Sequence, residues 1–374
     1  MPQRPPAEIG APLSEVDTPA LIIDLDAFER NLSALPRKVA GTPVKLRPHS
    51  KTHKSPIIAL KQMALGAVGV CCQKVGEAEA LVHGGVPDVL IANEIVGAAK
   101  LRRLAALARQ AKIAVCVDDP GNIADLADAA AEFDAKIEVL VEIDVGAARC
   151  GVAPGNAALD LARIVAASKH LHFGGLQAYQ GAAQHVRDHA ERRQAIERAV
   201  GLARDTKALI EAAGIPCPRV TGAGTGSFAF EAASGLYTEL QCGSYVFMDA
   251  DYNRNLDASG TAQPEFEQSL FIWATVMSRP LPERAVVDAG LKAVSVDSGM
   301  PVLPDFPDVA FTRASDEHGK LEIKGKVEGL DVGEKIRLTP GHCDPTVNLY
   351  DWYVGIRRNR VECIWPVAAR GALT

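Results

Sequence analysis

The stretch "LRPHSKTHKS" at residues 46–55 places two lysines and two histidines directly after a short apolar run. The amine of Lys51 is expected to enter a pocket with apolar walls, next to Arg47 and His49. Burial and nearby positive charge both lower the pKa of a lysine, and a neutral amine is a nucleophile that can form a Schiff base. Lys54 is expected to face away or to begin the next helix, so we assign the reactive amine to Lys51.

A second group of residues could bind a phosphate. The segment "TGAGTGS" (221–227) contains three glycines, and the backbone N–H groups of such a turn can surround an anion. "QCGSY" (241–245) follows the next expected strand and could complete the cup. Alone this signal is weak, because glycine-rich loops are often only tight turns. Together with a Schiff-base lysine it describes one cofactor, pyridoxal 5′-phosphate (PLP).

A third group, "GHCDP" (341–345), could bind a metal. In an extended segment His342 and Asp344 would share one face, with Cys343 opposite. One imidazole and one carboxylate suit Mn²⁺, Mg²⁺ or Co²⁺, with water and substrate completing the coordination. On spacing alone, a turn before Pro345 is the better interpretation.

His185 lies in the polar segment "AYQGAAQHVRDHAE". It could be an acid–base group over the pocket, because a histidine transfers protons near neutral pH. It could equally be a surface histidine.

These residues follow expected strands. The first two-thirds of the chain alternates short apolar runs with helical segments, as a buried parallel sheet requires. Eight such units predict a closed (β/α)8 barrel, whose functional face lies at the C-terminal ends of its strands. The expected strands are residues 44–49, 67–72, 88–93, 113–118, 137–144, 173–179, 219–224 and 239–247. Polar candidates at or just after their ends include Gln73, Arg149, Tyr179 and Gln241.

From about residue 266 the pattern changes to alternating apolar and polar residues between Gly, Pro and Asp turns, which predicts an antiparallel β domain. We expect residues 20–265 to form the barrel, and residues 1–19 and 266–374 the β domain. The strand-like stretch at 20–28 could belong to either.

The composition narrows the functional classes. The net charge of -6 is spread over both signs, which argues against a nucleic-acid partner. We find no apolar run of about 18 residues and no signal-like start, so no membrane association is expected. The eight cysteines form no C-x-x-C pair, which indicates reduced thiols in a cytoplasmic protein.

Long, ordered motifs make the chain resemble a known family. They include "DTPALIIDLDAFERNL", "GVCCQKVGEAEAL", "VEIDVGAARCGV" and "PGHCDPTVNLYDWYVGIR" besides the segments above. From about residue 15 to its end the chain resembles the D-threonine aldolases and 3-hydroxy-D-aspartate aldolases, relatives of D-serine dehydratase and, more distantly, of alanine racemase. The resemblance implies an α/β fold, with a PLP-binding TIM barrel of the alanine racemase type followed by an antiparallel β domain. It also implies a head-to-tail homodimer.

The resemblance implies a role for each candidate. Lys51 would be the Schiff-base lysine, Arg149 would meet the cofactor's phenolic oxygen, and Tyr179 would lie against its ring. Gln241 would stand near the pyridine nitrogen, which a neutral amide should leave unprotonated. The remaining roles are His185 as the base, His342 and Asp344 as the metal pair, and Gly224, Thr225, Gly226, Ser244 and Tyr245 as phosphate ligands.

These roles predict a lyase that cleaves D-threonine or 3-hydroxy-D-aspartate into glycine and an aldehyde, with a small molecule as its partner. The dehydratase relatives carry His-x-Cys at the metal position, so Asp344 favours aldol cleavage. Three alternatives stay open: a D-serine or 3-hydroxyaspartate dehydratase, a barrel hydrolase with a metal on His49 and His53, and a non-catalytic PLP-binding protein.

Overall fold

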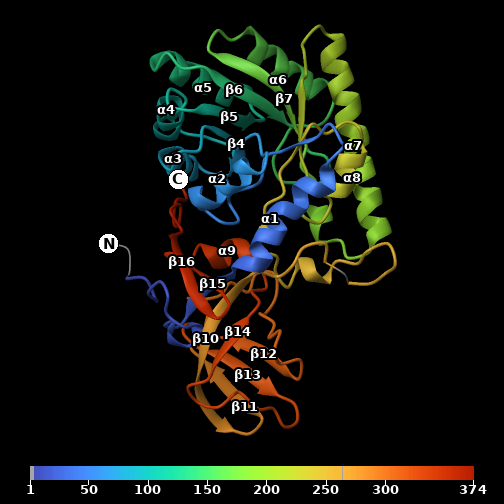
Figure 1. Cartoon of the computed structure of the whole chain (residues 1–374). Coiled ribbons are helices and arrows are strands. Elements are labelled where there is room, and N and C mark those ends of the chain that lie inside the picture. Colours follow the sequence, from blue (N-terminus) through green and yellow to red (C-terminus); the bar gives the residue numbers. More distant parts are fainter. Residues whose placement is uncertain (1–3, 263) are drawn as a thin grey trace.

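The computed structural model describes residues 4–262 and 264–374. It consists of a barrel surrounded by helices and a β domain at one end of it (Figure 1). The barrel sheet has eight parallel strands, and the second sheet is mostly antiparallel. The predicted fold class, a (β/α)8 barrel followed by an antiparallel β domain, is confirmed.

The barrel strands follow the order β2-β9-β8-β7-β6-β5-β4-β3. The barrel closes where the chain after β2 meets β3: the N–H of Cys71 donates to the carbonyl of Pro48 (2.9 Å), and the N–H of Ser50 donates to the carbonyl of Cys71 (2.7 Å). The last strand is shorter than expected, because residues 244–246 form a 3-10 helix. The strands are β2 Lys45–Leu46, β3 Val70–Cys72, β4 Asp88–Glu94, β5 Lys112–Val117, β6 Ile137–Glu142, β7 Leu171–Gln177, β8 Arg219–Gly222 and β9 Glu239–Leu240.

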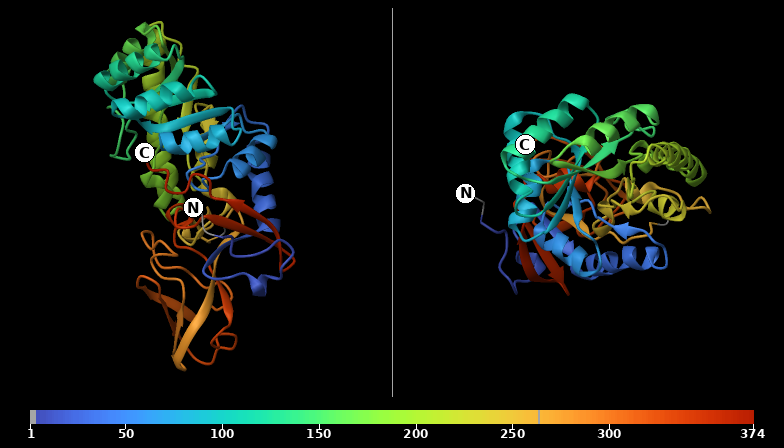
Figure 2. Two further views of the ribbon diagram at one scale, coloured as in Figure 1. Left: turned by 90° about the vertical axis from the view of Figure 1, so that its left-hand side faces the viewer. Right: turned by 90° about the horizontal axis from the view of Figure 1, so that it is seen from above.

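Helices cover the outside of the barrel, as the view from above shows (Figure 2). In α7, Ile196, Ala199, Val200 and Ala203 recur at the spacing of one helix face and are buried. Within the described residues, none of the helices combines the length and apolarity needed to cross a membrane. The helices are α1 Leu25–Val39, α2 Pro56–Ala64, α3 Val75–His83, α4 Ala98–Leu107, α5 Pro120–Glu132, α6 Asn156–Ala167, α7 His189–Ala212 and α8 Phe228–Ala233, with 3-10 helices η1 Leu13–Glu15, η2 Ala182–His185, η3 Ser244–Val246 and η4 Tyr252–Arg254.

The barrel interior is charged at the end where the strands begin. There Arg47 pairs with Asp88 (2.6 Å) and with Glu239 (2.8 Å). Gly69 leaves room for the guanidinium, since a Cβ at this position would lie 2.5 Å from Arg47 Nη1. Arg47 thus points to the opposite end of the barrel from the candidate site. Our expectation that it lowers the pKa of Lys51 is wrong.

The β domain contains a sheet of order β12-β13-β11-β10-β1-β15-β16, with β14 beside β10. The strand that the sequence left open, β1, pairs antiparallel with β10 and parallel with β15, so it lies in this sheet. One short helix, α9, precedes β15. The elements are β1 Ala20–Asp24, β10 Leu270–Leu281, β11 Arg284–Val287, β12 Val309–Ala314, β13 Gly319–Ile323, β14 Lys335–Leu338, α9 Cys343–Val347, β15 Trp352–Arg357 and β16 Arg360–Pro366.

Three successive residues after the last barrel strand, 249–251, hold the segment that leads into α9. The N–H groups of Ala250 and Asp251 donate to the carbonyls of residues 340 and 341 (3.0 and 3.2 Å). The carboxylate of Asp249 accepts from the N–H of residue 343 (2.9 Å). We call residues 249–251 the clamp, because they fix this part of the β domain at the C-terminal end of the barrel.

Replacing Arg47 by alanine should destabilise the protein by about 3–5 kcal/mol, because it leaves buried carboxylates without their counter-charge. Urea unfolding followed by circular dichroism measures this loss. Arg102→Ala is the control, since Arg102 and Glu132 form an exposed pair (61% and 49% exposed) worth at most about 1 kcal/mol. Equal, small losses for both variants would contradict a structural role of the Arg47 network.

Candidate active site

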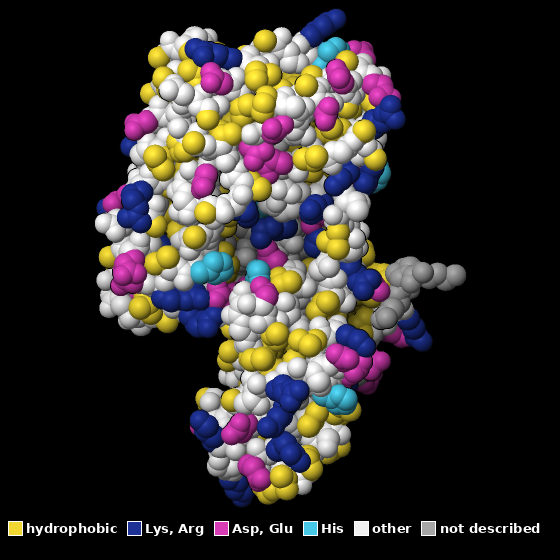
Figure 3. Space-filling model, turned by 180° about the vertical axis from the view of Figure 1, so that it is seen from behind, with side chains coloured by type: hydrophobic (Ala, Val, Ile, Leu, Met, Phe, Trp, Pro, Cys, Tyr) yellow, Lys and Arg dark blue, Asp and Glu magenta, His cyan; other side chains and the backbone are white. Residues whose placement is uncertain are grey.

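A cavity opens at the C-terminal end of the barrel, where the loops after several strands converge. Figure 3 shows the molecule hollowed between the barrel and the β domain, with Lys, Arg and His side chains gathered there. The lining brings together residues that the sequence placed at separate strand ends. These are Lys51, Gln73, Arg149, Tyr179, Gly224, Thr225, Gln241 and Ser244.

Lys51 lies in the turn that follows β2. Its amine forms an ion pair with a carboxylate oxygen of Asp344, in α9. Burial lowers the pKa of Lys51, but the charge of Asp344 outweighs that effect and holds the pKa above its ordinary value. The expected lowering of this pKa is therefore wrong, because a carboxylate 293 residues away in the sequence lies beside the amine.

Lys54, the other lysine of the motif, does not line the cavity. Its amine is paired with the carboxylate of Glu77, and the two side chains are 8% and 4% exposed. The side chain of Lys51 is 40% exposed. Of the two amines, the one with access to a cofactor is that of Lys51.

The glycine-rich turn after β8 has the properties of a phosphate cup. The hydroxyl of Thr225 is buried and has no hydrogen-bond partner among the described residues. Glycines keep the walls close: a Cβ on Gly224 would lie 2.4 Å from Gln184 Oε1, and one on Gly243 would lie 2.5 Å from Thr52 Oγ1. An unpaired hydroxyl in such a cradle suits the oxygens of a phosphate.

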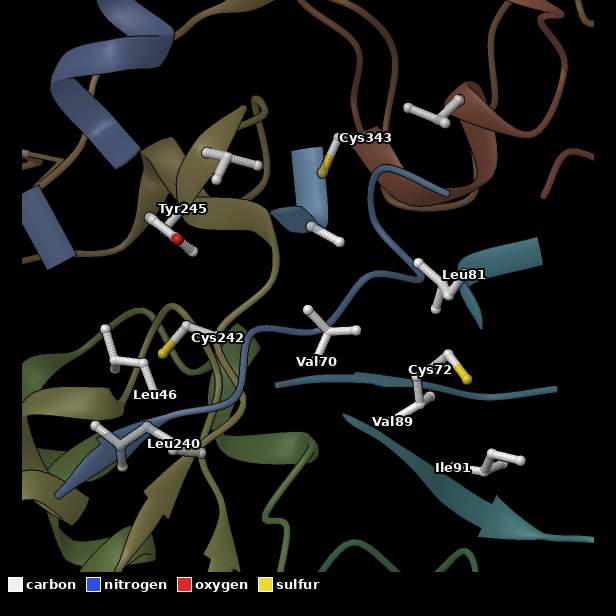
Figure 4. Close-up of a cluster of buried hydrophobic side chains, with 14 of the residues drawn as sticks. Leu46, Val70, Cys72, Leu81, Val89, Ile91, Leu240, Cys242, Tyr245 and Cys343 are labelled. Atoms are coloured by element: carbon white, nitrogen blue, oxygen red, sulfur yellow. The ribbon is translucent and has the colours of Figure 1, made fainter. Parts of the chain in front are cut away.

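Two residues of the predicted phosphate cup, Gly226 and Tyr245, have groups that are already bound to other parts of the protein. The N–H of Gly226 donates to the side-chain oxygen of Gln184 (3.0 Å). Tyr245 is buried, its hydroxyl accepts from Gln62 Nε2 (3.1 Å), and its ring packs against Phe266 at 5.5 Å. Figure 4 shows this ring within an apolar cluster. The side chain of Tyr245 therefore belongs to the core, and its backbone is the part left for a phosphate.

Arg149 is carried by the loop after β6. Its guanidinium lies over the ring of Tyr179 at 5.8 Å, and 4.0 Å from a carboxylate oxygen of Glu142. Burial and the neighbouring Glu94 raise the pKa of Glu142 above its ordinary value, which makes this carboxyl a weaker ionic partner for Arg149. The positive charge of Arg149 is thus left available for an anionic oxygen next to an aromatic wall.

Neutral amides form the rest of the wall. Gln241 Nε2 donates to Gln177 Oε1 (2.8 Å) and to Thr221 Oγ1 (3.0 Å). The amide nitrogen of Gln73 lies 2.8 Å from Nε2 of His49. Burial and the charge of Lys51 lower the pKa of His49 well below its ordinary value, so this imidazole is neutral.

We had expected the segment of His342 and Asp344 to be extended, but it is not. Residues Cys343–Val347 form helix α9, and Pro345 fits its first turn, where the missing N–H is not needed. The side chain of Cys343 is buried in the apolar cluster of Figure 4. The alternation argument was therefore wrong, although Asp344 does reach the amine of Lys51 at the cavity.

The two side chains have the chemistry of metal ligands. Nδ1 of His342 lies 2.8 Å from a carboxylate oxygen of Asp297, which leaves Nε2 for a metal. Burial raises the pKa of Asp344, but Lys51 and His342 lower it below its ordinary value, so it is ionised. No group of three or more His, Cys, Asp or Glu side chains suited to a metal occurs within residues 4–262 and 264–374. Water and substrate would have to complete the coordination.

His185 lies outside the cavity lining, next to Tyr252, with ring centroids 6.3 Å apart. Its Nδ1 is 2.7 Å from a carboxylate oxygen of Asp251, and its side chain is 53% exposed. A carboxylate therefore holds this histidine next to a residue of the cavity lining, Tyr252, so it is not a free surface side chain.

The barrel hydrolase has no support in this geometry. His53 is buried, accepts from the N–H of Ser55 (3.1 Å), and has its pKa lowered to about 4 by burial. His49 is occupied by Gln73, and neither histidine belongs to a metal-binding group of the described chain.

Several residues of the site escaped the sequence analysis. Thr52 and Gln177 line the cavity, and their places beside Lys51 and at the end of an expected strand could have identified them. Tyr252 also lines the cavity, while Asp251 and Asp297 hold the two histidines. No spacing in the sequence marks these last three.

Two family models match the chain. The alanine racemase N-terminal domain matches residues 23–251, and the putative serine dehydratase domain matches residues 269–356. The chain is 51% identical over 329 residues to the 3-hydroxy-D-aspartate aldolase of Paracoccus denitrificans (strain Pd 1222), covering 87% of this chain and 84% of that protein. It is 48% identical over 328 residues to the D-threonine aldolase of an Arthrobacter species, covering 88% and 86%.

A solved structure agrees with these matches. The crystal structure of D-threonine aldolase from Filomicrobium marinum superposes with a TM-score of 0.96 and 52% identity, covering 99% of this chain and all of that one. The resemblance read from the motifs is confirmed. The chain belongs to the PLP-dependent, fold-type III family that contains the D-threonine aldolases and the 3-hydroxy-D-aspartate aldolases.

Proposed function

We propose that this protein is a PLP- and divalent-metal-dependent lyase. It would cleave a D-3-hydroxy amino acid, D-threonine or 3-hydroxy-D-aspartate, into glycine and acetaldehyde or glyoxylate. The observation that carries this proposal is the contact between Lys51 of the barrel and Asp344 of the β domain. This contact supports a site in which Lys51 would hold PLP and Asp344 would bind the metal. The aldolase relatives, 51% and 48% identical, support the same reaction class.

The cavity fits the cofactor. When bound, PLP supplies an electron sink for the electron pair of the broken Cα–Cβ bond. Lys51 would hold it covalently, and the unpaired Thr225 hydroxyl would bind its phosphate. The further contacts would come from Arg149, Tyr179, Gln73, Gln241, Gly224, Ser244 and the backbone of Tyr245.

His342 and Asp344 would hold the metal, with Mn²⁺, Mg²⁺ or Co²⁺ suited to one imidazole nitrogen and one carboxylate. Such an ion would supply a Lewis acid for the substrate's β-hydroxyl. Asp297 would orient His342 through Nδ1.

His185 would remove the proton from the β-hydroxyl, directly or through water. Its Nδ1 is bound to Asp251, so Nε2 is the nitrogen left to accept the proton. Loss of this proton turns the hydroxyl into the carbonyl of the aldehyde as the Cα–Cβ bond breaks. A proton then added at Cα yields glycine.

A dehydratase is the second candidate, because residues 269–356 match the putative serine dehydratase domain. Against it stands the ligand chemistry: Asp344 occupies the second metal position, and the thiol of Cys343 is buried. A non-catalytic PLP-binding protein would have no use for the His342–Asp344 pair beside Lys51. We also propose a cytoplasmic homodimer acting on its small-molecule substrate alone; the eight unpaired cysteines support a reducing compartment.

Lys51→Ala should abolish covalent attachment of PLP while leaving the fold intact, because no other amine lines the described cavity. Borohydride reduction followed by peptide mass mapping should place the pyridoxyl group on Lys51 in the unsubstituted protein. Lys54→Met is the control, and should keep the label on residue 51. A label that survives in Lys51→Ala and disappears in Lys54→Met would show that the assignment is wrong.

EDTA should lower the rate of D-threonine cleavage by about 10²-fold or more without releasing PLP, because a Lewis acid contributes several kcal/mol to such a step. Mn²⁺, Mg²⁺ or Co²⁺ should restore it, and Asp344→Ala should resist this rescue. Asp344→Cys should shift the metal preference toward zinc, since thiolate is a softer ligand.

The products separate the two candidate functions. Glycine and acetaldehyde would support the lyase, whereas 2-oxobutyrate and ammonia would identify a dehydratase. Full activity of Asp344→Ala in EDTA would rule out the metal site.

A further inference from the structure

A buried carboxylate next to Tyr252 of the cavity lining binds three cationic or proton-donating side chains. Asp251 is 4% exposed. One of its oxygens, Oδ2, lies 2.7 Å from Nδ1 of His185. The other, Oδ1, accepts from Nη2 of Arg187 and from Nη2 of Arg254, the latter at 2.5 Å. Each oxygen thus has its own partners, and the two guanidiniums fix the orientation of the carboxylate.

We propose that Asp251 is a positioning residue of the cleavage reaction, which selects the tautomer of His185 and holds that base in register with the metal-binding segment. The inference rests on the proposed function, because it assigns Asp251 a task through the proposed base. Asp251 itself lies outside the cavity lining, so it would act through His185 and not by touching cofactor or substrate.

The first part of the proposal follows from hydrogen-bond chemistry. Burial raises the pKa of Asp251, but the bonds from Arg187, His185 and Arg254 lower it below its ordinary value, so the carboxylate is ionised. An ionised carboxylate accepts hydrogen bonds and cannot donate one. In its neutral form the imidazole of His185 must therefore carry its proton on Nδ1. Its Nε2 is left with a free lone pair, which is what a general base needs.

The second part follows from the backbone of the same residue. Asp251 belongs to the clamp, and its N–H donates to the carbonyl of Gly341 (3.2 Å), the residue before His342. Arg254 makes a second link, because its Nη2 also donates to the carbonyl of Ser298 (3.0 Å), and the hydroxyl of Ser298 lies 3.4 Å from Nδ1 of His342. The base and the metal pair are thus tied to one residue, although they come from different domains.

Asparagine at position 251 would reverse the tautomer. The amide has one oxygen, which the two guanidiniums require, so its NH₂ group would face His185. Nδ1 of the imidazole would then have to accept, and the proton would move to Nε2, where it blocks the base. Asp251→Asn should accordingly lower kcat by about 10²–10⁴-fold, the usual contribution of a general base, with KM little changed.

A double-mutant cycle in the PLP- and Mn²⁺-loaded enzyme separates this role from a merely structural one. In a His185→Asn background, Asp251→Asn should lower kcat by less than about threefold, because its effect runs through the missing imidazole. Asp88→Asn is the matched control: Asp88 is also bound by two cations, Arg47 (2.6 Å) and Lys112 (3.2 Å), but at the other end of the barrel. It should leave kcat unchanged.

Multiplicative losses in the cycle, or an unchanged kcat in Asp251→Asn, would overturn the proposal. If the unsubstituted enzyme cleaves its substrate and His185→Asn is fully active, the base assignment fails instead. An unsubstituted enzyme that does not cleave D-3-hydroxy amino acids would refute the proposed function.

Histidine ¹⁵N NMR of the unsubstituted enzyme provides a test that needs no folded Asp251 variant. It should show the Nδ1–H tautomer for His185, identified by loss of its signals in His185→Asn. The Nε2–H tautomer would overturn the proposal.

Discussion

The contact between the Lys51 amine and the Asp344 carboxylate is the interaction on which the site depends. It joins a residue just after the first barrel strand to one in the short helix of the β domain. Each charge is partly removed from water, and a single buried charge without its partner is costly. The pair therefore requires the β domain to meet the barrel at the C-terminal end of its strands. The clamp meets that requirement, since residues 249–251 bind the backbone just ahead of Asp344.

The barrel separates its polar groups into two sets with different tasks. At the end where the strands begin, Arg47 and its carboxylate partners satisfy one another, so this network has no group left for a ligand. At the other end the groups are incompletely paired: the hydroxyl of Thr225 has no partner in the described structure, and Arg149 lies 4.0 Å from the carboxyl of Glu142, whose pKa is raised. An unpaired hydroxyl that faces a cavity, close to an available positive charge, is what a site that waits for an anionic cofactor should show.

The sequence was sufficient to predict the order of the barrel strands and helices, although several strands end earlier than expected. The run at 88–93 corresponds to β4, Asp88–Glu94, because apolar strands joined by helices are a strong local signal. Lys51 and Thr225 were selected because they follow such strands, and both line the same cavity. Contacts between residues far apart in the chain were not predictable. The prediction of a lowered pKa for Lys51 was wrong because its partner, Asp344, comes from the other domain. The expected backbone conformation was also wrong at one place, since residues Cys343–Val347 form a helix where an extended segment was expected.

The central claim is that one cavity holds PLP on Lys51 and a divalent metal on His342 and Asp344. Crystals of the protein loaded with PLP and Mn²⁺, measured for anomalous scattering at the manganese edge, test it most directly. We expect an anomalous peak bound by His342 and Asp344, and Lys51 released from Asp344 and joined to the cofactor. A manganese peak elsewhere, with the Lys51–Asp344 pair unbroken, would contradict it.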